Sequence, residues 1–378
     1  MSQHPYIKYI ELKGYKSIKD LSCEFLPGLN ILIGDNGSGK SNFFEFVSNC
    51  FQRNYNELGA SFSAKVNYEA PVNDENNEDI LIWKGIAPHI GGQIKSLTDL
   101  ERRKITEEPS HSPIFRYVRF SLPELLLIGG ELNLNYSDKE VNLAINDDKS
   151  ILPYFLEIGL GFLVADLKTM SDDELNSSKL AEIINSFFEK IFFEFKRDVT
   201  RYSPIEDIKL SNAIRLAKLS ADSYEIRNIV LEYKINGDWF SWDGLSDGTK
   251  RVVYLISEVI GANLTLFKNF EDVLIYPTVF LEEPEIGVHP HQLHQLLQFL
   301  KEKSETRQIF ITTHSPQVLD ILGGEDLDRI IIAEISSQRG TMFRHLNKVE
   351  KKKAEIYLKE NGLLSDYWRF SDFQRTKA

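Results

Sequence analysis

The chain opens with short runs in which apolar and polar residues alternate. Residues 6–34 (YIKYIELKGYKSIKDLSCEFLPGLNILIG) break at Gly14 and at Pro27-Gly28, and this pattern predicts two or three strands. The last of these leads directly into a glycine-rich loop. Beyond the loop, apolar residues recur at spacings of three, four and seven, which predicts a helix with one buried face: Phe43, Phe44, Val47, Cys50 and Phe51.

Short apolar strands alternate with amphipathic helices in the last third of the chain. Strands are predicted at the start of 277–287 (PTVFLEEPEIG), in 307–316 (RQIFITTHSP) and in 328–336 (DRIIIAEIS), and helices in 252–267 and 291–305. This alternation is typical of an α/β fold whose sheet is mostly parallel.

The middle of the chain has a different pattern. Residues 80–86 (ILIWKGI) and 114–122 (IFRYVRFSL) read as strands, and residues from about 150 to 222 read as helical. Asn236-Gly237, between apolar runs, predicts a hairpin turn. We therefore expect four segments: the N-terminal part of an α/β head (1–60), an insertion lobe of mixed strands and then helices (61–225), the C-terminal part of the head (226–345) and a helical tail (346–378).

Composition narrows the classes of function. The 378 residues include 56 acidic and 44 basic side chains, a formal charge of −12, which argues against extensive nonspecific wrapping of nucleic acid but leaves room for a local basic groove. Two cysteines predict no disulfide framework.

The apolar stretch 151–167 is interrupted by Pro153 and Glu157 and is short for a membrane span. The N-terminus also lacks a signal-peptide layout, so we expect a cytoplasmic protein without a membrane partner.

Residues Gly34–Ser41 fit the phosphate-loop pattern G-x-x-x-x-G-K-[ST]. Backbone N–H groups of such a loop turn toward phosphate oxygens, and the following helix presents its positive end to the same anion. Lys40 would neutralise the β- and γ-phosphates, and the Ser41 hydroxyl would bind Mg²⁺. A chance glycine turn is the alternative, and the strand before and helix after the loop argue against it. The predicted nucleotide-binding residues are Gly34, Asn36, Gly37, Ser38, Gly39, Lys40, Ser41 and Asn42.

Two carboxylates and a histidine follow predicted buried strands. Glu282 and Glu283 end one strand and His314 ends the next, and ligands of α/β folds bind at such strand ends. Glu282 could hold Mg²⁺, Glu283 could orient or deprotonate the attacking water, and His314 could contact the γ-phosphate. The alternatives are a solvated helix start and a structural histidine. A further group, His289, His291 and His294, is interpreted as surface histidines because no carboxylate completes a metal-binding set.

Leu245-Ser246-Asp247-Gly248, at the start of a predicted helix, resembles the signature motif of ABC-type ATPases. The phosphate loop, the signature, the acidic strand end and the strand ending in histidine also come in the order of that family. The opening segment, with GYKSI followed by GLNILIGDNGSGKSN, is similar to the RecF, SMC and OLD branch. The resemblance covers about residues 5–60 and 225–335.

This resemblance implies an ABC-type P-loop head with an N-terminal antiparallel β lobe and a helical insertion lobe, which binds and hydrolyses ATP with Mg²⁺. It implies that Lys40 and the loop grip the phosphates, that Ser41 and Glu282 support Mg²⁺, that Glu283 is the catalytic base and that His314 senses the γ-phosphate. Ser246 and Gly248 would reach the ATP of a second copy, in a dimer that could assemble further.

Two features depart from the family pattern. Glu282 stands where aspartate is commoner, and the glutamine loop is not evident, with Gln93 as its candidate. The paired arms of SMC proteins are absent, and the segment after His314 is short for the nuclease domain of OLD enzymes.

We therefore expect an ATPase that switches a separately encoded effector in a bacterial antiviral defence or stress module. The alternatives are a RecF-like DNA-repair ATPase, for which DNA would be a partner, and a nucleotide-gated scaffold with negligible turnover.

Overall fold

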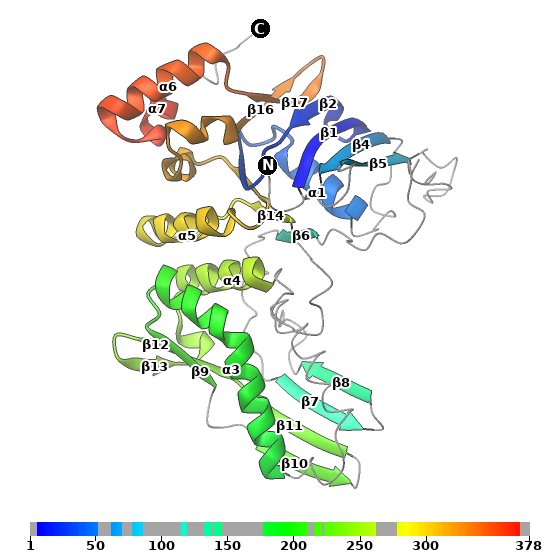
Figure 1. The fold of residues 1–378 in the computed structure, drawn as a ribbon, viewed down its shortest axis with the longest axis vertical. Helices are drawn as coiled ribbons and strands as arrows, with labels where there is room; N and C mark the ends of the chain where they lie inside the picture. Colours follow the sequence, from blue (N-terminus) through cyan, green and yellow to red (C-terminus); the bar gives the residue numbers. More distant parts are fainter. Residues whose placement is uncertain are drawn as a thin grey trace. The chain divides into compact units, whose positions relative to one another are not determined.

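The computed structural model describes residues 6–51, 62–69, 78–85, 115–118, 132–137, 140–145, 177–210, 215–220, 223–261 and 278–370. Their contacts divide them into two units (Figure 1). The first unit contains the described residues of 6–118, 278–286 and 300–370, and the second contains those of 132–261 and 287–299. Gln93, the candidate for the glutamine loop, lies outside the described residues.

A ten-stranded sheet forms the centre of the first unit (Figure 1). In spatial order its strands are β5 (Glu78–Gly85), β4 (Phe62–Glu69), β1 (Tyr6–Tyr15), β2 (Ile18–Glu24), β17 (Gly340–His345), β16 (Ile330–Ser336), β3 (Leu29–Ile33), β15 (Ile309–Thr313), β14 (Thr278–Glu282) and β6 (Phe115–Val118).

The parallel half of this sheet runs from β16 to β6. Ile31 at the centre of β3 pairs with Ile311 of β15 on one side and with Ile330 of β16 on the other. All residues of β3, β14 and β15 are buried, as expected for strands covered on both faces of a parallel sheet. The predicted α/β fold is confirmed. Because these strands are parallel, their carboxyl ends meet at one edge of the sheet.

The antiparallel half contains the predicted N-terminal strands β1 and β2, and β4 and β5 extend it. The C-terminal strand β17 joins the two halves because it pairs antiparallel with β16 and also with β2, where Gly340 faces Ile18. The β lobe and the parallel sheet are therefore one continuous sheet.

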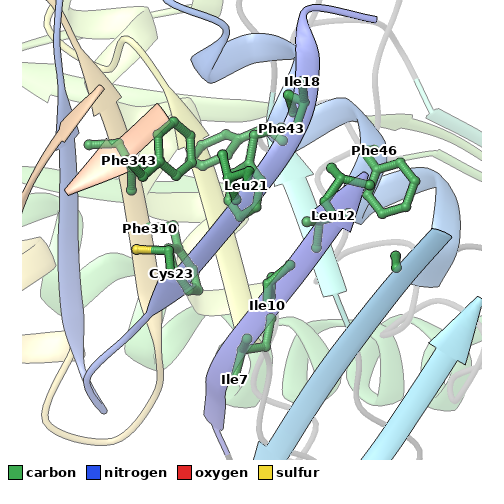
Figure 2. Close-up of a cluster of buried hydrophobic side chains, with 14 of the residues drawn as sticks. Ile7, Ile10, Leu12, Ile18, Leu21, Cys23, Phe43, Phe46, Phe310 and Phe343 are labelled. Atoms are coloured by element: carbon green, nitrogen blue, oxygen red, sulfur yellow. The ribbon is translucent and has the colours of Figure 1, made fainter. Parts of the chain in front are cut away.

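Helix α1 (Lys40–Phe51) packs its apolar face on the sheet. Phe43, Phe44 and Val47 are buried, as the sequence pattern predicted. The ring of Phe43 meets that of Phe343 edge to face with centroids 5.0 Å apart, and Phe44 meets Phe280 at the same distance. Figure 2 shows Phe43 and Phe343 together with the side chains of β1 and β2. The buried face of α1 thereby ties the antiparallel half of the sheet to its parallel half.

A change of register in β1 adds Ile7 to this core. The pairing of β1 with β4 shifts between Ile7 and Tyr9, which places Ile7 on the buried face with Ile10 and Leu12 although strict alternation would turn it away. All three are fully buried (Figure 2).

Helices and 3-10 turns complete the first unit. Among them, α6 begins after Asn347, whose side chain accepts hydrogen bonds from the N–H groups of Val349 and Glu350, and it ends at Gly362, where φ is +96°. Such caps satisfy backbone groups that the helix leaves unpaired. The elements are η6 (Pro316–Ile321), η7 (Gly324–Arg329), α6 (Lys348–Asn361) and α7 (Leu364–Phe370). Among the described helices, none combines the length and apolarity that a membrane crossing requires.

The second unit combines helices with two antiparallel sheets. One sheet has the order β10 (Arg215–Ser220), β11 (Ser223–Ile229), β7 (Leu132–Ser137) and β8 (Glu140–Ile145), and the other the order β13 (Asp238–Phe240), β12 (Leu231–Ile235) and β9 (Asp207–Leu210). Its helical elements are α3 (Ser177–Tyr202), η3 (Trp242–Gly244), α4 (Asp247–Gly261) and the first part of α5 (Pro290–Lys303).

Two predictions for this unit have different outcomes. The hairpin at Asn236-Gly237 is confirmed, with both residues in the left-handed region at φ +52° and +86°. The prediction that residues up to 222 are helical is wrong beyond Tyr202, where β9 and β10 follow. Strand β9 is stabilised by pairing with β12, a partner distant in sequence that local periodicity does not reveal.

Replacing Phe310 by alanine should destabilise the first unit. The ring stacks on Phe280 with centroids 4.7 Å apart and meets Phe25 edge to face at 5.0 Å. Phe310→Ala leaves a cavity at the centre of the parallel strands, which costs about 3–5 kcal/mol. Urea unfolding followed by circular dichroism should show a lower midpoint. Phe370→Ala, at a ring that is 83% exposed, should change it little, and equal midpoints for the two variants would contradict this view of the core.

Candidate nucleotide-binding site

The glycine-rich loop connects the buried strand β3 to helix α1. Gly34 and Ser38–Lys40 are buried, whereas Asp35, Asn36 and Gly37 are exposed. Gly37 and Gly39 have φ values of +82° and +92°, which glycine adopts without strain. Ser41 and Asn42 lie in the first turn of α1. The loop therefore brings backbone N–H groups and the positive end of α1 to the carboxyl edge of the parallel sheet.

Neighbouring chain segments leave no room for side chains at two of the loop glycines. A Cβ on Gly34 would lie 2.1 Å from the carbonyl oxygen of Ala333, and one on Gly39 would lie 1.9 Å from Oγ1 of Thr341. The Ser17 hydroxyl bonds that of Thr341 at 2.8 Å and accepts a hydrogen bond from the Asn42 amide, also at 2.8 Å. Ser17 of the GYKSI element thus packs against the loop and, with Thr341, holds it in place.

The Lys40 ammonium is held inside the loop. Its Nζ donates to the carbonyl oxygens of Gly34 and Asp35 at 2.8 and 3.0 Å and to the Ser38 hydroxyl at 3.3 Å. These bonds hold the ammonium group against the loop, where it could neutralise a bound phosphate.

The electrostatic surroundings of Lys40 identify its neighbours at the sheet edge. Burial lowers the pKa of its ammonium group, and four carboxylates oppose this effect, Glu283 most strongly, followed by Asp35, Glu285 and Glu282. Three of these acids belong to the segment that begins at the end of β14. The phosphate loop and the acidic strand end therefore form one charged cluster.

Glu282 and Glu283 continue the parallel pairing beyond the apolar part of β14. Glu282 is buried and pairs with Thr312, and the N–H of Glu283 donates to the carbonyl oxygen of Thr312 at 2.9 Å. Glu283 has φ +48°, a left-handed conformation that costs a residue with a Cβ about 1 kcal/mol or more. This turn directs the chain away from the sheet directly after the predicted base.

His314 follows β15, which lies beside β14 as the sequence predicted. Its Nδ1 lies 3.2 Å from Oε1 of Glu283 and 3.9 Å from Oε1 of Glu285. The imidazole is exposed while Glu285 is largely covered. The ring is thus oriented by carboxylates on the neighbouring strand end, within the cluster that contains Lys40.

Glu285 is a member of this cluster that the sequence analysis did not select. Its Oε1 accepts a hydrogen bond from the Thr313 hydroxyl, and its Oε2 has no hydrogen-bond partner among the described residues. Burial raises the pKa of the Glu285 carboxyl, and the Thr313 bond opposes this. A third acid in Glu-Glu-Pro-Glu was visible in the sequence, but only the turn at Glu283 brings it back toward His314.

The signature segment belongs to the second unit. Ser246 precedes α4, and its hydroxyl accepts a hydrogen bond from the N–H of Thr249 at 3.2 Å and bonds the Thr249 hydroxyl at 2.9 Å. This is an N-cap. Ser246 is exposed and Gly248 half-buried, so the start of α4 presents a hydroxyl and backbone N–H groups at a helix N-terminus. His289, His291 and His294 are exposed.

The fold and the phosphate loop define an ABC-type P-loop ATPase head of the RecF, SMC and OLD branch. A family model described as "AAA domain, putative AbiEii toxin, Type IV TA system" matches residues 29–320, and the chain belongs to this family.

Individual relatives are distant but cover most of the chain. It is 22% identical over 359 residues to the Septu protein PtuA of Bacillus thuringiensis, covering 91% of this chain and 80% of that protein. It is also 22% identical to the Retron Vc95 probable ATPase of Vibrio cholerae, covering 86% of this chain and 72% of the relative. The Smc head domain of Pyrococcus furiosus matches 94% of this chain and 99% of its own with a TM-score of 0.50 and 16% identity. This structural likeness shows the shared fold.

Substitution of Gly39 should abolish nucleotide binding more completely than substitution of Gly37. Both have a positive φ, but a Cβ on Gly37 would meet no described atom within 4 Å, whereas one on Gly39 would collide with Thr341 and Ser17. Backbone strain alone costs about 1 kcal/mol, so Gly37→Ala should weaken binding by roughly fivefold and Gly39→Ala by 100-fold or more. Titration with a fluorescent ATP analogue measures both, and equal losses would contradict the buttressing by Ser17 and Thr341.

Proposed function

We propose that this protein binds ATP with Mg²⁺ and hydrolyses it. The observation that carries the proposal is the contact between His314 and Glu283 at the sheet edge where Lys40 is held in the phosphate loop. A buried cation in a glycine-rich loop at a helix N-terminus suits the phosphates of a nucleotide. A carboxylate in contact with an imidazole suits the activation of water beside the terminal phosphate.

The chemistry of each side chain suits one step of the reaction. The oxygen of a water molecule bonds to the γ-phosphorus while the bond from that phosphorus to the bridging oxygen of ADP breaks, and the Glu283 carboxylate accepts the proton. His314 interacts with the γ-phosphate, and Lys40 neutralises the β- and γ-phosphate oxygens.

Mg²⁺ fits the site because the Ser41 hydroxyl at the start of α1 and the buried carboxylate of Glu282 are oxygen ligands of the kind that this ion prefers. When bound, the ion would offset negative charge on the phosphate oxygens. The extra methylene of glutamate at position 282 is compatible with direct or water-mediated contact.

The protein acts as a dimer that closes around ATP. The exposed Ser246 and the start of α4 form a phosphate-binding helix terminus, and we assign it to nucleotide held by a second copy. ATP favours the closed dimer because its γ-phosphate contacts exist only in that state, and a ligand shifts an equilibrium by its differential affinity. Hydrolysis then releases the two heads, and higher assembly of such dimers is compatible with this cycle.

The released energy switches a separately encoded effector in a bacterial defence module. The names of the relatives, a Septu protein and a retron ATPase, and the toxin named in the family description support this role. The acidic balance of the chain, with a formal charge of −12, favours a protein partner over extensive contact with nucleic acid.

Two substitutions should separate nucleotide binding from turnover. Lys40→Ala removes the buried cation and should lose ATP binding, while Glu283→Gln removes the base and should lower the hydrolysis rate by about 100-fold or more but retain ATP and trap the dimer. Phosphate release measures the hydrolysis rate, and light scattering measures the dimer.

Lys13→Ala and Glu305→Gln change exposed residues and serve as controls, which should behave like the unaltered protein. Undiminished hydrolysis in both site variants would refute the site, and negligible turnover by the unaltered protein would leave a nucleotide-gated scaffold.

Affinity purification of Glu283→Gln from its native cells with ATP should capture the effector. We expect a second protein in stoichiometric amount that is lost in Lys40→Ala, identified by mass spectrometry. Nuclease digestion of the same sample tests the competing role, since bound DNA without a second protein would replace the defence assignment by a RecF-like repair function.

A further inference from the structure

The start of the signature helix is bonded to a side chain from the beginning of α5. Nε2 of Gln292 donates to Oγ1 of Thr249 at 3.3 Å, and this hydroxyl also bonds Ser246. Thr249 is buried and Gln292 half-buried. A chain of polar contacts therefore leads from the exposed Ser246 hydroxyl through Thr249 to Gln292, all within the second unit.

The backbone of the signature also lies against the segment that precedes α5. A Cβ on Gly248 would lie 3.2 Å from Oε1 of Gln292 and 3.2 Å from the carbonyl oxygen of Gly287. Gly287 itself has φ +73°. A Cβ at this position would thus crowd the segment of its own chain that precedes α5, in addition to any phosphate that approaches from outside.

Gly287 ends the short loop that begins at Glu283. In this loop the N–H of Ile286 donates to the carbonyl oxygen of Glu283 at 3.2 Å, which tightens the turn after the catalytic residue. The chain passes from the first unit to the second between Ile286 and Gly287. A displacement of the signature that moved Gly287 would therefore be transmitted along the chain to Glu283 over very few residues.

We propose that Gln292 is a positioning residue that latches the signature to the start of α5, a few residues after the loop that begins at Glu283. Through this latch, engagement of Ser246 and Gly248 by nucleotide on a second copy is coupled to the orientation of the catalytic carboxylate in the first. The inference rests on the proposed ATP-bound dimer and adds to it a physical connection between the two nucleotide sites. The amide suits this role because its Nε2 donates to Thr249 while its Oε1 lies beside Gly248.

Gln298 provides a matched control on the same helix. Its Nε2 lies 2.9 Å from Nε2 of the exposed His294, and its side chain is exposed. Alanine at position 298 removes a glutamine hydrogen bond from α5 without touching the signature.

The test uses the full chain in the Glu283→Gln background with ATP and Mg²⁺. Sedimentation velocity over a protein dilution series measures the dimer Kd. Adding Gln292→Ala should raise it by about tenfold, because a signature that is no longer held in place must be ordered on dimerisation, which costs a factor of a few for each ordered segment, and a symmetric dimer contains two signatures. Adding Gln298→Ala should leave it unchanged. The affinity of the monomer for ATP, measured below the dimer Kd, and the Tm should match the parent in both variants.

Substitution of Thr249, which accepts the hydrogen bond from Gln292, tests the latch independently. Thr249→Ser keeps the hydroxyl and should preserve the dimer Kd, whereas Thr249→Val removes it and should reproduce the effect of Gln292→Ala. With Glu283 restored, Gln292→Ala should lower the Hill coefficient of ATP hydrolysis toward one.

The outcomes are distinguishable. A dimer Kd for Gln292→Ala equal to that of the parent would overturn the latch while leaving the proposed dimer intact, and so would parallel losses of Tm and monomer ATP affinity, which indicate a merely structural role. A Glu283→Gln parent that stays monomeric with ATP bound would overturn the proposed dimer and the latch together.

Discussion

Parallel pairing of β3, β15 and β14 is the constraint on which the site depends. In-register hydrogen bonds along these strands place the phosphate loop, His314 and the acidic pair at consecutive positions along one edge of the sheet. Because the three strands are buried along their whole length, a slip of register would expose apolar residues or bury polar ones. The apolar core therefore determines the spacing of the charged groups.

The charged cluster at this edge combines one buried cation with four carboxylates. Lys40 is buried, which disfavours its charged form, and the carboxylates around it offset that effect. Conversely, the acids of the β14 end would repel one another without the cation. Such opposing groups are typical of functional sites, where environment and neighbours act on pKa values together. Glu285 fits this description best, since its side chain is largely covered and, among the described residues, only one of its oxygens has a hydrogen-bond partner.

Left-handed backbone conformations occur at several residues around the site. Gly37, Gly39 and Glu283 all lie in the left-handed region. For the glycines this conformation is free of steric penalty, but for Glu283 it is unfavourable and is retained because the ladder bond to Thr312 and the turn closed by Ile286 hold the residue from both sides. The turn leads the chain from the sheet edge toward Gly287.

Elements whose signals come from neighbouring residues can be predicted from the sequence. The phosphate loop, the buried strands, the amphipathic face of α1 and the Asn236-Gly237 turn follow from periodicity and glycine placement, because neighbouring residues alone produce these signals. Other features become visible only in the folded chain: β17 joins both halves of the sheet, and β9 is a strand. Ser17 and Thr341 lie against Gly39, and Glu285 and Gln292 contact residues distant in sequence. Each of these depends on contacts between residues far apart in the chain, whose free energy is gained only on folding and leaves no local pattern in the sequence.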